Sequence, residues 1–161
     1  MFFHGNNKLN LYPDEKYFER YLTLYNTGKE FGVTVAHENV CRCSGGDLSF
    51  LLKMSEALGS SAKFVLDLKQ SRRIGKNPND FIKALKNRII HIHYSDGSES
   101  GECVKFGKGK FDNSTFIDNL QQTEYTGTVI LELYRNNFKD IDDLTNNFLD
   151  FSAFFNNKKF I

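Results

Sequence analysis

The sequence predicts an α/β fold built on a parallel sheet. Five short apolar runs are rich in Val, Ile and Phe and are too short to be helices. Stretches with helical periodicity separate them, and the two patterns alternate along the chain, which is typical of α/β proteins. No linker or low-complexity segment interrupts the alternation, so we expect one domain over residues 1–161.

The five apolar runs are the predicted strands, and each is bounded by polar or turn-forming residues. They are residues 1–5 (MFFHG), 32–40 (GVTVAHENV), 63–68 (KFVLDL), 88–96 (RIIHIHYSD) and 128–134 (TVILELY). Crossovers between parallel strands are right-handed, so all five strands should end on the same side of the sheet.

Five helices are predicted beside these strands, from apolar residues that recur at helical spacing. They cover residues 14–31, residues 47–58, residues 79–87, a stretch with Phe116, Ile117 and Leu120, and residues 140–155. Asp14 and Ser114 are the expected N-caps of the first and fourth helix. Gly59 should end the second helix, and Asn77-Pro78 should precede the third.

Composition excludes several classes of protein. The net charge is +1 and 25% of residues are charged, which gives no electrostatic footprint for nucleic acid or an anionic membrane. No apolar stretch approaches the roughly 20 residues that span a bilayer, and the N-terminus does not resemble a signal peptide. Cys41, Cys43 and Cys103 are an odd count, so we expect reduced thiols and a cytoplasmic location. A metal role for Cys41 and Cys43 is disfavoured, because no second cysteine pair accompanies them.

Polar side chains recur where each predicted strand ends, about one βα repeat apart. They are His4, Glu38, Asp67, His93 and Glu132. A single such residue is usually a helix cap or a solvated loop residue. Five in register also fit a shared metal or acid/base site, because that end of a parallel sheet is where chemistry is found. His91 lies two residues before His93, so both imidazoles should share one face.

Five motifs, "AHEN", "FVLDLKQ", "IHIHYSD", "FGKGKFD" and "YTGTVILEL", resemble in that order the C-terminal part of the xylose isomerase-like TIM barrels. This superfamily contains sugar phosphate isomerases and epimerases, ketose epimerases, inosose dehydratases and endonuclease IV. "MFFHG" resembles the fourth strand of such a barrel. The resemblance implies a partial (βα)8 TIM barrel of about five parallel βα units, equivalent to strands four to eight.

The resemblance also implies a ligand set and a chemistry. Glu38, Asp67, His93 and Glu132 match the ligands of one divalent metal ion per chain, which would be Mn²⁺, Co²⁺, Mg²⁺ or Zn²⁺. Glu38 and Glu132 match the two catalytic glutamates that move a proton through a metal-bound enediolate of a sugar or sugar phosphate.

Other matched residues would surround this site. We expect His4, His91, Asp96 and Lys108 to orient the ligands or to touch the substrate. Gly107, Gly109 and Asp112 resemble the family's G-x-G-x-x-D loop, whose glycines allow a tight backbone path.

Three departures argue against an endonuclease IV-like enzyme. Gln70 stands where the pattern has a histidine, Gly101 and Cys103 stand where it has Asp-x-His, and Lys108 replaces a glutamate. The third zinc site of that branch is therefore not expected, and the near-zero net charge agrees with this.

Length leaves the function open. A complete barrel needs about 250 residues, so the predicted sheet would have unpaired edges at residues 1–5 and 128–134. Exposed edges attract another chain, and we expect them to be closed by a homodimer or by a complementing chain. One hypothesis is a sugar (phosphate) isomerase or epimerase. The other is a catalytically inactive half-barrel that self-associates or binds a partner.

Overall fold

The computed structural model describes residues 1–9, 12–98 and 103–157. Its main sheet has five strands, all parallel, each beside the next one in the chain. They are β1 (Phe2–Phe3), β2 (Ala36–Glu38), β3 (Phe64–Asp67), β4 (Ile89–Tyr94) and β7 (Thr128–Leu131). Strand order therefore follows sequence order without the reversal that marks a doubly wound sheet. The predicted α/β class and parallel sheet are confirmed.

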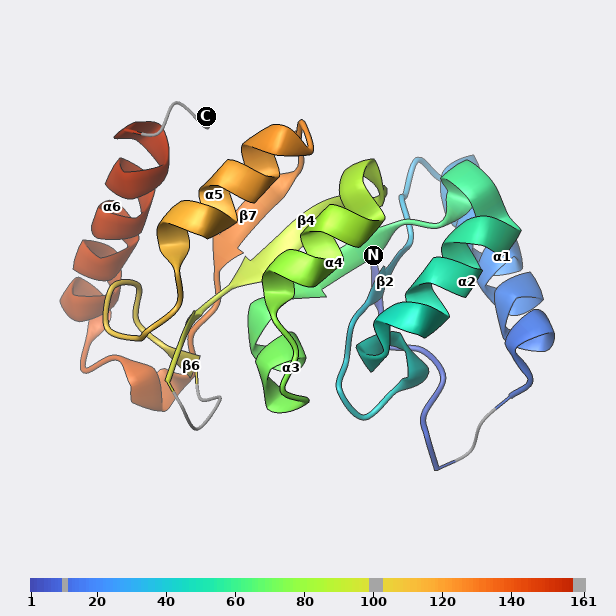
Figure 1. Cartoon of the computed structure of the whole chain (residues 1–161), viewed down its shortest axis with the longest axis horizontal. Helices are drawn as coiled ribbons and strands as arrows, with labels where there is room; N and C mark the ends of the chain where they lie inside the picture. Colours follow the sequence, from blue (N-terminus) through green and yellow to red (C-terminus); the bar gives the residue numbers. More distant parts are fainter. Residues whose placement is uncertain (10–11, 99–102, 158–161) are drawn as a thin grey trace.

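Helices cover one face of this sheet and form a second layer. Figure 1 shows α4 and α5 in front of the strands, α2 and α1 toward the right-hand end, and α6 at the left-hand end, past α5 and β7. Their bounds are α1 (Asp14–Glu30), α2 (Leu48–Leu58), α4 (Pro78–Leu85), α5 (Asn113–Gln122) and α6 (Ile141–Asn157). Short 3-10 turns lie at Ser44–Gly46, Gly59–Ser61, Lys86–Arg88 and Arg135–Asn137.

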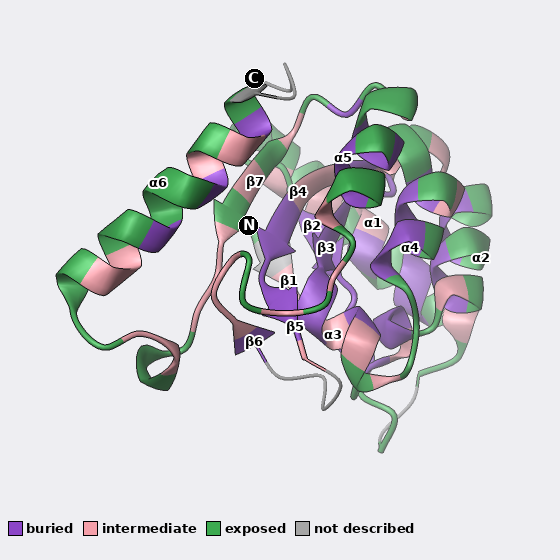
Figure 2. Ribbon diagram, turned by 60° about the vertical axis from the view of Figure 1, so that its left-hand side comes forward, coloured by how far each residue is buried: buried purple, intermediate pink, exposed green. Residues whose placement is uncertain are grey.

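The main core lies between the sheet and these helices. We call this side of the sheet the helix face. It carries Phe64, Leu66, Ile92 and Tyr94, all buried against apolar residues of the helices. In Figure 2 strands β2 and β3 and the inward sides of the helices are buried, whereas β7 and the outer side of α6 are largely exposed or half-buried. Tyr94 joins α6 to this core, since its ring centroid lies 5.0 Å from that of Phe151 and 5.8 Å from that of Phe116.

Two of the expected helix ends are confirmed, and two expected caps are wrong. Gly59 is the C-cap of α2, and Asn77 caps α4 by accepting from the Asn79 N–H. Asp47, which was not predicted as a cap, accepts from the Ser49 N–H at the start of α2. Asp14 is the first helical residue of α1 rather than its cap, because Pro13 with its extended backbone takes the cap position. Ser114 lies inside α5, and its place is taken by Asp112, whose carboxylate reaches the Thr115 N–H.

The strict alternation of strand and helix is also wrong in two places. Helix α3 (Leu68–Arg73) follows β3 directly and precedes α4 without a strand between them. Two short antiparallel strands, β5 (Asp96–Gly97) and β6 (Cys103–Val104), follow β4. Elements of two to six residues are too short to show a hydrophobic period. Among the described helices, none is long and apolar enough to cross a membrane.

Candidate metal centre

The four predicted ligands stand at the C-terminal ends of four neighbouring strands. Glu38 ends β2, Asp67 ends β3, His93 lies in β4, and Glu132 directly follows β7. Parallel pairing places them on one face. Asp67 pairs with His93, Glu38 pairs with the residue two before Asp67, and His93 pairs with the residue two before Glu132. This face is opposite the helix face, and we call it the site face.

The side chains converge, as the sequence predicted. His93 Nδ1 lies 3.3 Å from Glu132 Oε2 and 3.7 Å from Glu38 Oε1. One donor atom from each of Glu38, Asp67 and His93 falls within 4.8 Å of the others. His4 Nε2 lies 3.2 Å from Glu38 Oε2. Metal–oxygen bonds of about 2.0–2.6 Å allow two donors of one ion to be up to about 5 Å apart, so Glu38, Asp67 and His93 could hold a single divalent ion.

The two glutamates have opposite electrostatic environments. Burial raises the pKa of the Glu38 carboxyl, with Asp67 adding to the effect and His93 opposing it. The hydrogen bond from His93, together with Lys69, lowers the pKa of Glu132 to about 2. In the metal-free chain the Glu38 carboxyl therefore takes up a proton more easily than the Glu132 carboxyl does.

The two histidines on β4 also differ. Burial alone would lower the pKa of His93, but the hydrogen bond and charge of Glu132, with Glu38, raise it overall. Burial lowers the pKa of His91, and His93 adds to this. His91 packs edge-on against His93 from two residues earlier on the same strand, with ring centroids 5.2 Å apart.

Lys69 belongs to the cluster, although the sequence analysis did not single it out. Its Nζ lies 3.3 Å from Asp67 Oδ2 and 3.0 Å from Glu132 Oε1. A lysine in "DLKQSRR" resembles a solvent-facing residue. Its position two residues after Asp67 is the one sequence feature that could have indicated that it lies near the site. The short α3 turns this side chain back over the strand ends.

Asn39, the last residue of "HEN", is a second residue that sequence reasoning missed. It is fully buried, accepts from the Asp67 N–H over 2.6 Å, and donates to the Asp67 carbonyl and the Ser71 hydroxyl. These bonds fix the end of β3 against the end of β2. Asp67 Oδ1 also accepts from the Gln70 N–H and so caps α3.

The family profile of the xylose isomerase-like TIM barrel matches residues 1–151. The chain belongs to this family. The resemblance that the motifs indicated is therefore confirmed. A search of curated proteins finds no match.

Solved TIM-barrel structures superpose on this chain over part of their length, as expected for a partial barrel. A D-tagatose 3-epimerase-like protein superposes with a TM-score of 0.76 at 18% identity, covering 99% of this chain and 64% of that chain. A probable 3-DHS dehydratase from Bacillus anthracis gives 0.71 at 16% identity, covering 91% and 60%. A D-psicose 3-epimerase from Clostridium cellulolyticum H10 gives 0.69 at 15% identity, covering 88% and 55%. This chain thus spans less than two thirds of the length of each of these barrels.

Two residues expected near the site of this xylose isomerase-like barrel have no contact with the cluster among the described hydrogen bonds and ion pairs. The Asp96 carboxylate is buried and accepts from the backbone N–H groups of Gly97, Gly107 and Phe111, so it organises the glycine loop. Lys108 is exposed, and within the described residues no hydrogen bond or ion pair joins it to the cluster.

Two of the residues that depart from the endonuclease IV pattern have structural contacts, and a third lies outside the described residues. Gln70 has a structural role, since its side-chain oxygen accepts from the Cys41 N–H. Gly101 lies outside the described residues. Cys103 is buried, and its thiol donates to the Glu132 carbonyl. All three cysteines are free thiols.

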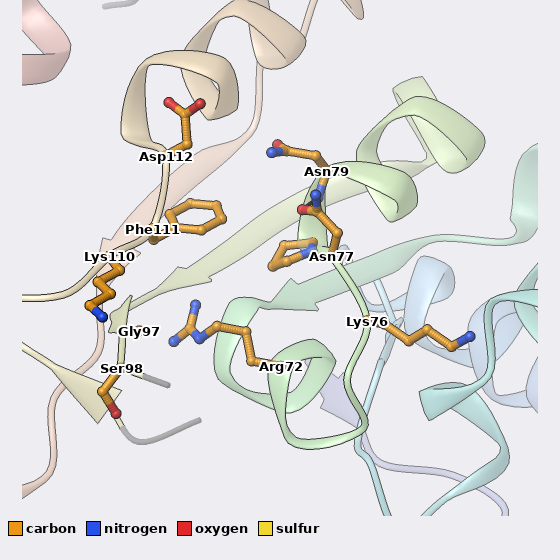
Figure 3. Close-up of a pocket in the computed structure, with 10 residues that line it drawn as sticks. Arg72, Lys76, Asn77, Asn79, Gly97, Ser98, Lys110, Phe111 and Asp112 are labelled. Atoms are coloured by element: carbon orange, nitrogen blue, oxygen red, sulfur yellow. Dashed lines mark hydrogen bonds between the residues drawn. The ribbon is translucent and has the colours of Figure 1, made fainter. Parts of the chain in front are cut away.

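A surface cavity of about 330 Å³ opens between α3, the start of α4 and the loop before α5 (Figure 3). It is lined by Arg72, Lys76, Asn77, Pro78, Asn79, Gly97, Ser98, Lys110, Phe111 and Asp112. None of the four predicted ligands lines it, so the cavity is separate from the carboxylate cluster.

Proposed function

We propose that this chain carries the metal centre of a sugar or sugar phosphate isomerase or epimerase. Glu38, Asp67, His93 and Glu132 would hold one divalent ion. The observation that carries the proposal is their convergence from four neighbouring strands onto the site face. Membership of the family and the likeness to sugar epimerases support it.

Buried carboxylates are costly unless they are paired or bind a metal. When bound, a divalent ion would polarise the carbonyl and hydroxyl oxygens of a ketose. Mn²⁺, Co²⁺ and Mg²⁺ suit an oxygen-rich ligand set, and Zn²⁺ accepts the same residues.

The two glutamates would move the proton. One of the two carboxylates would accept the proton from the carbon beside the carbonyl, and the other would return a proton to it.

The test starts with metal content. Protein purified without chelator should contain or take up about one Mn²⁺ or Co²⁺ per chain, and Glu38→Gln and His93→Ala should weaken binding by more than about 100-fold. Glu56→Gln, an exposed carboxylate of α2, is the matched control and should bind as the wild type does. Exchange of solvent deuterium into ketoses and ketose phosphates then measures the proton transfer. A protein that neither takes up metal nor exchanges deuterium would contradict the proposal.

A second candidate is a catalytically inactive half-barrel that self-associates. Both outer strands of the sheet, β1 and β7, have a partner on one side only, and large apolar side chains are exposed near the β7 edge. They include Ile130, Ile141, Phe148 and Leu149. We propose a second copy of the chain as the occupant of this edge, because the same unpaired strand and the same exposed apolar side chains on two copies can face each other across a two-fold axis. A stable metal-free dimer without deuterium exchange would favour this candidate.

A further inference from the structure

The centre already contains a cation of its own. The Lys69 side chain is only 3% exposed, and its ammonium contacts Asp67 Oδ2 and Glu132 Oε1 at 3.3 and 3.0 Å. It also lies 4.6 Å from the centroid of the Tyr134 ring. Lys69 therefore faces two of the four residues that would hold the metal ion.

The charge of the cluster explains why a cation is placed there. Three carboxylates, from Glu38, Asp67 and Glu132, converge on the site face. Glu38 has contacts with His4 and His93, whereas Asp67 has its ion pair with Lys69. Without a cation between them, the carboxylates of Asp67 and Glu132 would repel each other in a poorly solvated site.

We propose that Lys69 is a resident counter-cation, which stabilises the metal-free centre and which a divalent ion must displace from Asp67 and Glu132. This inference rests on the proposed metal centre. A divalent ion bound to the carboxylates of Asp67 and Glu132 would lie close to the Lys69 ammonium, and the two cations would repel each other in this poorly solvated site. Displacement is sterically feasible, because lysine has a flexible four-carbon stem, and because Glu132 and Tyr134 border solvent on that side.

Two consequences follow for the wild-type chain. Its folded state should not depend on metal, because Lys69 already neutralises the carboxylates. Its metal affinity should be weaker than the ligand set alone would give, because part of the binding free energy is spent on removing the ammonium from its carboxylates.

The decisive variant is Lys69→Met, which keeps the length of the stem and removes the charge. Mn²⁺ affinity should tighten by about tenfold or more, measured by titration calorimetry on chelator-treated protein. The melting temperature of the variant should fall in EDTA and recover in Mn²⁺, whereas that of the wild type should change little between the two. Lys53→Met, an exposed lysine of α2, is the control and should behave as the wild type does.

The outcomes separate this inference from the proposed function. If the wild type binds Mn²⁺ and Lys69→Met binds it equally or more weakly, the inference is overturned and the metal centre stands. If only Lys69→Met binds Mn²⁺, the inference is supported and the metal-dependent function of the wild type fails. If neither binds Mn²⁺, both are overturned. Should Lys69→Met not fold, Lys69→Gln, which keeps a hydrogen-bond donor for Glu132, is judged by the same two measurements.

Discussion

His37 and His93 lie on opposite faces of the same sheet, and their pKa values shift in opposite directions. His37 lies on the helix face, fully buried, with ring centroids 5.7 Å from Tyr17 and 6.1 Å from Phe50. Burial lowers its pKa to about 4. On the site face, Glu132 and Glu38 raise the pKa of His93 despite burial. Apolar surroundings keep one imidazole neutral, whereas carboxylates favour the charged form of the other.

The lowered pKa of His37 predicts that the protein loses stability in acid. The unfolded chain binds a proton at His37 below a pH of about 6.5, whereas the folded chain resists protonation until about 4. The free energy of unfolding should therefore fall as pH drops through this window, by about 3 kcal/mol from this residue. Urea denaturation at several pH values, compared between wild type and His37→Phe, isolates this contribution. Equal pH dependence in both proteins would contradict it.

Replacing the uncharged Asn39 should lower the stability of the protein strongly. Asn39→Ala removes the acceptor of the buried Asp67 N–H and the donor to the Asp67 carbonyl. Unfolding should become easier by about 3 kcal/mol, because buried backbone groups lose their partners. Asn146→Ala, at an exposed position of α6, is the matched control and should change stability by less than about 0.5 kcal/mol. Thermal or urea denaturation measures both.

Among the structural elements, the glycine loop before α5 depends on the single carboxylate of Asp96. Three backbone N–H groups point at it, from Gly97, Gly107 and Phe111. Gly107 has a positive φ of 74°, and a Cβ on Gly109 would meet the Asp96 carboxylate and the Gly97 carbonyl. The G-x-G spacing therefore serves this turn.

Asp96→Asn should loosen this loop. The amide keeps one acceptor oxygen and places an NH₂ group where a second acceptor was needed, so at least one N–H is left unpaired. We expect a loss of about 2 kcal/mol in the stability of the loop, seen as faster hydrogen exchange at Gly107 and Phe111. Asp118→Asn, on the exposed side of α5, is the control. Unchanged exchange at both amides would show that the carboxylate does not hold the loop.

At the scale of the whole molecule, the open β7 edge predicts how the chain associates. Phe148 is 51% exposed on α6, and Phe148→Lys should weaken a dimer formed at this edge by at least about tenfold. Leu52→Lys, at a 43% exposed position of α2, should leave association unchanged. Sedimentation velocity over a range of concentrations measures both. A wild type that stays monomeric would contradict self-association and favour a different chain as the partner at this edge.

Local patterns in the sequence were sufficient for the strands, the parallel sheet, the family and four converging side chains, because period-two apolar runs and a βα repeat constrain topology strongly. The cap at Asp14 was wrong because α1 begins directly after Pro13, and the cap at Ser114 was wrong because the Asp112 carboxylate accepts from the Thr115 N–H. Helix α3 and the β5–β6 pair were missed because they are too short to show periodicity.

Only the tertiary structure decided what surrounds the four side chains. That Lys69 turns back onto Asp67 and Glu132, that Asn39 fixes the end of β3, and that Asp96 organises a loop depend on contacts between segments far apart in the chain. Side-chain direction and burial at such contacts follow from packing, which no local pattern encodes. For the same reason, the opposite pKa shifts of Glu38 and Glu132 appear only once the chain is folded.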